Sequence, residues 1–351
     1  MSLAQIARTL GLSITTVSRA LGGFDEVALA TRERVRAEAE RIGYRANTTA
    51  RRLQSGRSEA IGLVLPTNPG QFDDPFFLRL MAAIGPALAS AGLDLLVMAA
   101  PPGPEEMRAY RHLIDGRRVD GVLIARTRLH DERIALLLDS KMPFVAHGRT
   151  QDPRPHAWVD TDGAAAMAAA TERLVDLGHR RIAMLTAGPG TNYGHDRETG
   201  WRRAMTRHGL ATDLCCEALP TEVEGERAAR LLLASDATAI LCATDRLAIG
   251  AMRAVVGTGR IVGADVSVIG FDNLPFASYV HPKLTTIEQP VEQAGRTMVS
   301  MLLQVLAGAD PATLNTMLPT RLIVRGSDGM VAKNPEIITG DHHETPIAHT
   351  S

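Results

Sequence analysis

Residues 3–21 restrict the possible fold more than any other part of the chain. Four apolar residues recur there at helical spacing: Leu3, Ile6, Ala7 and Leu10. This spacing predicts an amphipathic helix that Ser2 caps and Gly11 ends. Ser13 can then cap a second helix. Two short helices joined by a tight turn are typical of a helix-turn-helix, whose second helix faces the base edges of DNA.

A longer pattern covers residues 6–21 and reads I-A-x-x-L-G-L-S-x-x-T-V-S-R-A-L. It resembles the opening of the lactose/galactose repressor family of bacterial transcription regulators. The resemblance implies a sequence-specific repressor that binds a palindromic operator as a homodimer and responds to a small effector, either an inducer or a corepressor. The alternative is a pair of surface helices that pack for structural reasons alone.

The resemblance also assigns DNA contacts to individual residues of this head region. Base contacts are expected from Ile14, Thr15 and Arg19. Arg19 suits a forked contact with guanine, because a guanidinium presents two parallel donors. Phosphate contacts are expected from three polar residues: Ser13, Thr16 and Asn47.

A third helix and a short fourth one are predicted next. Thr31 can cap the third helix, and Gly43 ends it. Residues 47–57 then predict a helix of barely two turns, too short to be stable alone. In the family this segment is a hinge helix that inserts a leucine into the DNA minor groove, and Leu53 matches that leucine. The alternative is a plain linker with Leu53 in a subunit contact. Ala46 stands where the family usually has proline, so the turn into the hinge is less rigid.

Length and composition set the broad class of protein. A chain of 351 residues suggests two or three domains, and a 45% hydrophobic share is that of a soluble globular protein. Apolar runs such as residues 164–170 are too short to cross a membrane, and Gln5 and Arg8 interrupt any signal-peptide core. Cys215 and Cys216 are adjacent, which suits a disulfide poorly. We therefore expect a cytoplasmic protein without a membrane partner.

Charge is divided unevenly along the chain. The net charge is −1 overall, but residues 1–60 hold ten Arg and six acidic residues, a net of +4. The remainder therefore sums to −5. A basic head on an acidic body fits double-stranded operator DNA as the partner of the head, because Arg side chains offset phosphate charge. Taken alone, such a charge run also fits a solvated surface.

From residue 61 the pattern changes to short apolar runs separated by helical stretches. The expected strands are 61–65, 93–99, 121–125, 144–146, 181–186, 239–242, 266–270, 285–289 and 320–324. The expected helices are 75–91, 104–116, 132–140, 162–177, 195–208, 245–256 and 291–307. This alternation predicts an α/β core of two doubly wound lobes with parallel sheets. The resemblance implies a periplasmic-binding-protein-like core of this kind behind an all-α helix-turn-helix headpiece.

The resemblance divides the chain into segments. They are a helix-turn-helix domain (1–46), a hinge (47–57), a first lobe (58–160 and 288–319), a second lobe (161–287 and 320–329) and a tail (330–351). The chain is thus expected to cross between the lobes near residues 160, 288 and 320. The tail lacks periodicity and is expected to be disordered.

Ligands of doubly wound lobes bind beyond the carboxyl ends of the strands, so the loops there are the candidate effector site. The loop after 61–65 carries Asp74 beside Phe76 and Phe77. A carboxylate beside an aromatic face suits a sugar, which has apolar ring faces and a rim of hydroxyls. The alternative places these phenylalanines in the core or in a dimer face.

The loop after 144–146 adds His147 and Arg149 to the candidate site. Many family members carry an acid where Gly148 stands. His-Gly-Arg after Pro-Phe-Val is similar to regulators of α-glucoside or maltose use. A mono- or disaccharide is therefore the expected effector.

Two further loops carry charged candidates. Arg197 follows the glycine-rich loop from residue 188, and by resemblance it binds the effector through a bidentate fork. The loop spacing G-x-G-x-x-x-G does not match the dinucleotide fingerprint. Asp272 matches the family's effector-binding aspartate, and an ionised Asp can accept from two hydroxyls at once. The alternatives are a surface salt bridge for Arg197 and a turn cap for Asp272. Three more residues complete the predicted site: Thr244, Phe276 and Gln289.

Enzyme motifs are absent from the sequence. It contains no P-loop, no G-x-S-x-G elbow, no H-E-x-x-H and no cysteine pair at zinc spacing. We therefore expect no catalysis, no cofactor and no bound metal, and we assign the acidic and histidine cluster at 341–344 to a solvated tail. Two rival interpretations are a sugar-binding transport protein and an enzyme that uses a nucleotide or sugar phosphate.

Overall fold

The computed structural model describes residues 2–22, 24–44, 56–68, 74–188 and 190–331. Three helices near the N-terminus pack around one small core: α1 (Leu3–Leu10), α2 (Ile14–Leu21) and α3 (Leu29–Arg41). Gly11, with a φ of 65°, ends α1, and the Ser13 hydroxyl caps α2 by accepting from the Thr16 amide at 3.0 Å. The shared core contains Ile6, Ala7, Val17, Ala20, Val27, Val35 and Ala39. The predicted helix-turn-helix is present.

One predicted helix cap is confirmed in position only, and another is wrong. Ser2 occupies the N-cap position of α1, but its side chain makes no capping hydrogen bond. The third helix begins at Leu29, not after Thr31. The carbonyl of Ala28 already accepts from the amides of Thr31 and Arg32, at 2.9 and 3.0 Å, so Thr31 lies within the first turn.

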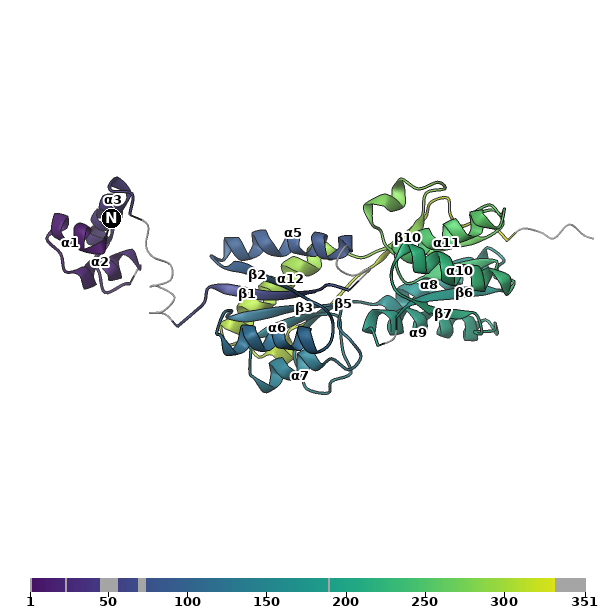
Figure 1. The fold of residues 1–351 in the computed structure, drawn as a ribbon, viewed down its shortest axis with the longest axis horizontal. Helices are drawn as coiled ribbons and strands as arrows, with labels where there is room; N and C mark the ends of the chain where they lie inside the picture. Colours follow the sequence, from purple (N-terminus) through teal and green to yellow (C-terminus); the bar gives the residue numbers. More distant parts are fainter. Residues whose placement is uncertain (1, 23, 45–55, 69–73, 189, 332–351) are drawn as a thin grey trace, which may run out of the picture.

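The first lobe is built on a parallel six-stranded sheet in the order β11-β5-β4-β3-β1-β2. Its strands are β1 (Ala60–Pro66), β2 (Asp94–Ala100), β3 (Gly121–Ala125), β4 (Phe144–His147), β5 (Ala157–Thr161) and β11 (Asn315–Leu318). One face packs against α5 (Pro75–Ser90) and α12 (Val291–Leu306), and the other packs against α6 (Pro104–Asp115) and α7 (Glu132–Asp139) (Figure 1).

The second lobe repeats this plan with the sheet order β12-β10-β9-β8-β6-β7. Its strands are β6 (Ile182–Ala187), β7 (Cys215–Ala218), β8 (Ala239–Cys242), β9 (Ser267–Asp272), β10 (Thr285–Glu288) and β12 (Arg321–Ile323). Its helices are α8 (Gly163–Asp176), α9 (Asn192–Arg207), α10 (Glu222–Ala234) and α11 (Asp245–Gly257). Only the β10–β12 pair among the described strands is antiparallel. The predicted core of two doubly wound lobes is confirmed.

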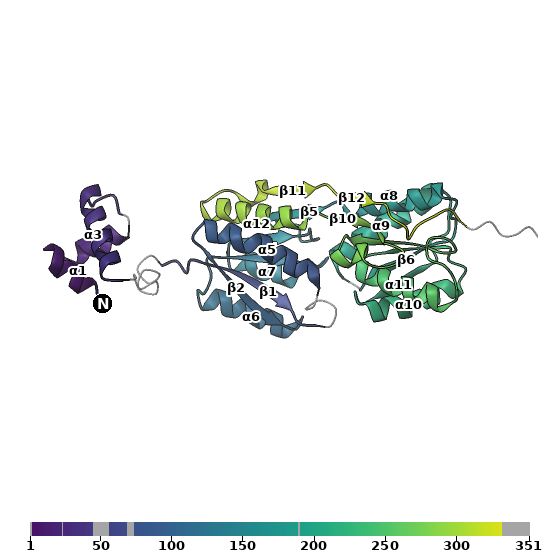
Figure 2. The ribbon, with the colours of Figure 1, turned by 90° about the horizontal axis from the view of Figure 1, so that it is seen from above.

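The chain passes between the two sheets three times (Figure 2). β5 leads to α8 through residue 162, β10 leads to α12 through residues 289–290, and β11 leads to β12 through residues 319–320. These positions adjoin the expected crossings. The crossings bring strand ends from both lobes to one cleft, where ligands of such sheets bind. The exact segment boundaries stay a prediction.

Among the described α-helices and strands, four were not predicted from the sequence, namely β5, β7, α10 and β11. β7 and β11 are edge strands with mostly part-buried or exposed side chains, so neither shows an apolar run. β5 mixes buried apolar residues with the polar pair Asp160 and Thr161. α10 carries charged residues along its exposed side, which obscures its apolar stripe.

Several expectations fall on residues outside the described part of the chain. These are Ala46, Asn47 and Leu53 with the hinge as far as residue 55, and the tail from residue 332. The start of the predicted tail is described, and the Val331 amide donates to the Leu177 carbonyl at 3.0 Å. Among the described residues, no helix has the length and apolar character to cross a membrane.

Candidate DNA-binding and effector sites

The exposed side of α2 carries the residues expected to contact bases. Ile14 is 53% exposed, and Thr15 beside it is also exposed. Ser13 and Thr16 lie at the helix start, where their hydroxyl oxygens are 2.8 Å apart. The first turn of α2 therefore presents small polar groups and one apolar side chain to solvent, as a recognition helix does.

Arg19, the third of these residues, forms an ion pair in the free chain. Its Nη1 lies 2.8 Å from Oε2 of Glu26, in the loop between α2 and α3. Both side chains are more than half exposed. An exposed pair of this kind contributes little in water, so a DNA base can replace Glu26 as the partner of Arg19.

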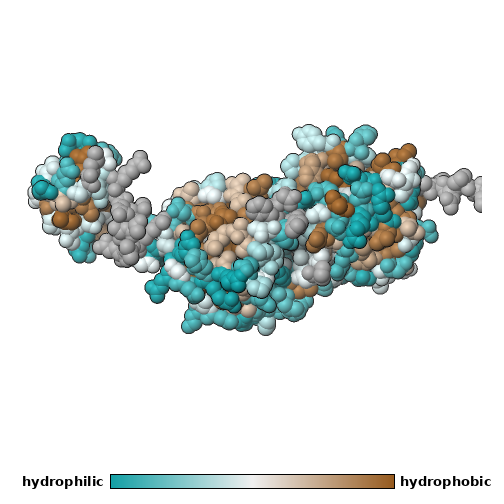
Figure 3. Space-filling model, viewed as in Figure 1, coloured by the Kyte–Doolittle hydropathy of each residue, from teal (hydrophilic) through white to brown (hydrophobic). Residues whose placement is uncertain are grey.

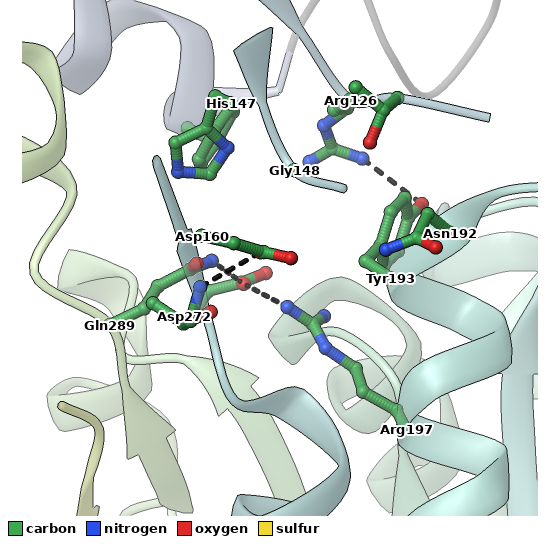
Figure 4. A pocket seen from close by; sticks show the side chains of 12 residues that line it. Arg126, His147, Gly148, Asp160, Asn192, Tyr193, Arg197, Asp272 and Gln289 are labelled. Atoms are coloured by element: carbon green, nitrogen blue, oxygen red, sulfur yellow. Dashed lines mark hydrogen bonds and ion pairs between the residues drawn. The ribbon is translucent and has the colours of Figure 1, made fainter. Parts of the chain in front are cut away.

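A small cavity lies between the two lobes, beyond the carboxyl ends of both sheets (Figure 4). Its volume is about 40 Å³, which leaves room for about three water molecules. The first lobe contributes Phe76, Arg126, Thr127, His147, Gly148, Asp160 and Thr161. The second lobe and the crossover contribute Asn192, Tyr193, Arg197, Asp272 and Gln289. Five predicted effector residues are therefore brought together: Phe76, His147, Arg197, Asp272 and Gln289.

Asp272 ends β9 and is 3% exposed. Its Oδ1 accepts from Nε2 of Gln289 at 2.6 Å and lies 3.8 Å from Nη2 of Arg197. Burial raises the pKa of Asp272 to about 6, although the charge of Arg197 opposes this shift. Its φ of 119° is rare for a non-glycine residue, and such backbone strain concentrates at ligand sites. The Asp272 carboxylate can accept hydrogen bonds from further donors.

Arg197 stands on α9 between two aromatic rings. Its guanidinium carbon lies 3.4 Å from the ring centroid of Phe271 and 4.9 Å from that of Tyr193. Nη1 donates to the carbonyl of Ala243. Burial lowers the pKa of Arg197, so its positive charge gains from additional acceptors. Figure 4 shows Arg197 pointing toward Asp272.

Arg126 reaches into the cleft from the end of β3 (Figure 4). It forms an ion pair with Asp74, and its Nη1 donates to the Tyr193 hydroxyl at 3.1 Å. Its guanidinium carbon lies 5.0 to 5.5 Å from the ring centroids of Phe76, Phe77 and Tyr193. Burial lowers the pKa of Arg126, but the charges of Asp74 and Asp272 and the contact with Tyr193 together more than offset this and leave the pKa raised. Its Nε is buried and has no hydrogen-bond partner in the described structure.

Five predicted effector residues do not line the cavity: Asp74, Phe77, Arg149, Thr244 and Phe276. Asp74 caps α5 by accepting from the Phe76 amide at 2.9 Å. Phe77 packs in the first-lobe core. Thr244 caps α11, and Phe276 lies in a short 3-10 helix after β9. Asp74, Phe77 and Thr244 support the cleft by capping and packing, because protein groups already occupy their polar or apolar surfaces.

Arg149 turns away from the cavity and joins the two lobes instead. Its Nε donates to Oδ2 of Asp160 at 2.9 Å, and its Nη2 donates to Oδ2 of Asp196 on α9 at 2.8 Å. Gly148 just before it has a φ of 105°, and a Cβ there would lie 2.2 Å from Oγ1 of Thr127. An acidic side chain at this position would therefore not fit unless Thr127 moved.

Six polar or aromatic lining residues were not predicted: Arg126, Thr127, Asp160, Thr161, Asn192 and Tyr193. Arg126 and Thr127 directly follow the predicted strand 121–125, so the strand-end rule that selected His147 also applied to them. Asp160 ends a strand that the sequence did not reveal. Within the part of the chain that the structure describes, no His, Cys, Asp or Glu cluster is placed to hold a metal ion.

Comparisons with known proteins support both parts of this architecture. The family model for bacterial regulatory proteins of the lacI family matches residues 2–47, and the model for a periplasmic binding protein-like domain matches residues 171–327. Over 318 residues the chain is 40% identical to the HTH-type transcriptional regulator RafR of Escherichia coli, covering 90% of this chain and 94% of RafR. The chain belongs to the lacI family. It is accordingly a helix-turn-helix transcriptional regulator that binds DNA.

Solved structures of lacI-family regulators share the fold. A complex of the transcriptional regulator CelR with cellobiose has a TM-score of 0.73 and 31% identity, covering 93% of this chain and 99% of that one. The lac repressor dimer bound to operator and the anti-inducer ONPF has a TM-score of 0.82 and 28% identity, covering 94% and 99%. The likeness extends over headpiece and both lobes.

Proposed function

We propose that this lacI-family regulator is a repressor whose affinity for a palindromic operator is set by a sugar bound in the cleft. The observation that carries this proposal is the buried Asp272 and Arg197 pair, which shares a cavity with Phe76 and Tyr193. The carboxylate can accept from two ring hydroxyls, the guanidinium can donate to others, and an aromatic ring can cover an apolar sugar face. The complex of CelR with cellobiose supports a sugar as the class of ligand.

The effector is a mono- or disaccharide, with α-glucosides as the favoured class because of the His147-Gly148-Arg149 sequence. His147 lines the cavity next to Phe76, with ring centroids 5.3 Å apart. Burial lowers the pKa of His147, so the neutral ring predominates at neutral pH and can both donate to and accept from a hydroxyl.

Sugar binding must change the contacts between the lobes, because a cavity of about 40 Å³ is far smaller than a sugar unit. Two backbone hydrogen bonds now join them, from Leu129 N to the Gly190 carbonyl at 2.9 Å and from Asn192 N to the Thr127 carbonyl at 3.0 Å. The Arg149 and Asp196 ion pair adds a third link. A ligand that rearranges these links changes the angle between the lobes and, through that angle, the affinity for DNA. The coupling free energy is reciprocal, so DNA changes the affinity for the ligand by the same factor.

On DNA, we assign base contacts to Ile14, Thr15 and Arg19, all of which are exposed on α2. We assign phosphate contacts to Ser13, Thr16 and Asn47, and insertion into the minor groove to Leu53. Asn47 and Leu53 lie outside the described residues, so their assignment rests on the family resemblance. The segment boundaries given above are proposed on the same basis.

The regulator acts as a homodimer, as the lac repressor does on its operator. Apolar side chains exposed on both lobes suit a partner subunit (Figure 3). On the first lobe these are Leu78 of α5 and Val97 of β2, and on the second they are Val223 and Leu231 of α10 and Val256 of α11. Burying such patches between two copies removes them from water. The regulator works in the cytoplasm, where operator DNA lies, without a cofactor and without catalytic activity.

Arg19→Ala tests the base contact. Loss of a forked contact with guanine should weaken binding to a selected operator by about 1 to 3 kcal/mol, with little effect on random duplex. The measurement is a gel shift at fixed salt with both duplexes. Arg8→Ala, which removes an exposed arginine from α1, is the matched control. An equal loss on both duplexes for Arg19→Ala would exclude base reading.

Asp272→Ala tests the effector site. The variant should bind operator with near wild-type affinity but should no longer respond to sugar, because the cavity loses its central acceptor. The measurement is operator binding as a function of sugar concentration. Asp115→Ala removes an exposed aspartate from α6 and should leave the response intact. An unchanged response in Asp272→Ala would overturn the assignment.

Sugar affinity should depend on pH through the same carboxyl group. Its pKa is raised to about 6, so the group becomes protonated as the pH falls below that value and loses acceptor capacity. Affinity for a sugar should therefore be full above pH 7 and about tenfold weaker at pH 5. Calorimetric titration across this range measures the effect, and Asp272→Asn should flatten it. A pH profile that is identical in the Asn variant would contradict the role of this carboxylate.

A further inference from the structure

A second cavity adjoins the effector cavity. Its volume is about 210 Å³, roughly five times that of the effector cavity. The two cavities share Arg126 and Tyr193 and no other described residue of their linings. Two neighbouring residues after β3 line different cavities: Thr127 lines the first cavity and Arg128 lines the second. Nη1 of Arg126 donates to the Tyr193 hydroxyl at 3.1 Å, so these two side chains form a common wall between the cavities.

The lining of the second cavity is that of a polar ligand site with an apolar rim. Glu106 is fully buried there and is held by ion pairs with Arg128 and Arg133. Leu219, half exposed, lies at its edge beside Pro220. This combination of charged acceptors and donors with small apolar surfaces suits hydroxyl-rich ligands.

Two polar atoms of this lining lack partners. Oδ1 of Asn68 and Nε of Arg126 are buried and form no hydrogen bond with any described residue. A buried donor or acceptor left unsatisfied is costly, and native structures usually supply it with a partner. Oδ1 of Asn68 requires a hydrogen-bond donor and Nε of Arg126 requires an acceptor, and a sugar hydroxyl can act as either.

We propose that the two cavities form one binding site for a saccharide of at least two units. One unit takes the place around Asp272 and Arg197, the next occupies the second cavity, and the link between them passes where Arg126 now contacts Tyr193. The separation of these two side chains opens the common wall. This inference rests on the proposed sugar effector and specifies its length.

The test compares glucose, maltose, cellobiose and maltotriose by calorimetric titration of the full-length protein. At least one of the longer saccharides should bind ten or more times tighter than glucose. Leu219→Trp, which places a large ring in the second cavity, should abolish that advantage while leaving glucose binding unchanged. Ile261→Trp adds the same ring to an exposed position between α11 and β9 and should behave like the wild type.

Each outcome bears on a different claim. Glucose binding as tight as that of every longer saccharide, or an advantage that survives in Leu219→Trp, would overturn the two-cavity site and leave the sugar effector in place. If no saccharide in the panel binds, the proposed sugar effector fails and this inference fails with it. Thermal unfolding of Leu219→Trp at the wild-type temperature confirms that the variant is folded.

A separate observation concerns the DNA-facing surface. The carboxylate of Glu26, in the loop after α2, lies 2.8 Å from Nη1 of Arg19, and both side chains are more than half exposed. Glutamate accepts from the N4 amino group of cytosine in the major groove, just as arginine donates to guanine. The charge of Arg19 beside it offsets the repulsion that an acidic side chain otherwise meets from DNA phosphates.

We infer that Glu26 reads cytosine next to the guanine that Arg19 reads. The neighbouring Asp25 offers a matched control, since it carries the same charge but pairs with Arg32 at 3.6 Å. Selection from randomised duplexes should show that Glu26→Ala loses at least tenfold preference for cytosine at one position per half-site. Asp25→Ala should change affinity uniformly. A uniform change for Glu26→Ala as well would overturn base reading by Glu26.

Discussion

The cleft depends on how two buried guanidinium groups are neutralised. Arg126 and Arg197 expose 10% and 5% of their side chains, and each faces one aspartate, Asp74 or Asp272. An isolated charge at such a site is costly, so each aspartate offsets the buried charge of the arginine that it faces. Asp74 shows this most directly, because it holds Arg126 with one oxygen and caps α5 with the other.

The two pairs are not equally satisfied. Asp74 forms a direct ion pair with Arg126 and the pKa of that arginine is raised, whereas Arg197 lies 3.8 Å from Asp272 and its pKa is lowered by burial. The raised pKa of Asp272 has the same cause. The pair of Asp272 and Arg197 on the second lobe therefore keeps unused capacity for hydrogen bonds. A polar ligand gains most there, because protein groups leave the charges of Asp272 and Arg197 incompletely solvated.

Sequence reasoning reached the parts of the fold that local pattern encodes. Strands such as β3 and β8 are continuous apolar runs, and Asp272 and His147 were found because ligand residues follow strand ends. The same rule would have reached Arg126, but β5 with Asp160 was hidden by its mixed composition. The partners that decide the roles of Asp74 and Arg149 lie 52 and 47 residues away, and no local pattern records such pairings.

Both functional surfaces use arginine in a common way. On α2 the free chain holds Arg19 on Glu26, and in the cleft it holds Arg126 on Asp74. A ligand that engages such an arginine exchanges one partner for another, so the net gain is the difference between two interactions and is much smaller than either. A wrong base or a wrong sugar breaks the internal pair without replacing it fully. Discrimination therefore comes from the competing carboxylate as much as from the arginine that contacts the ligand.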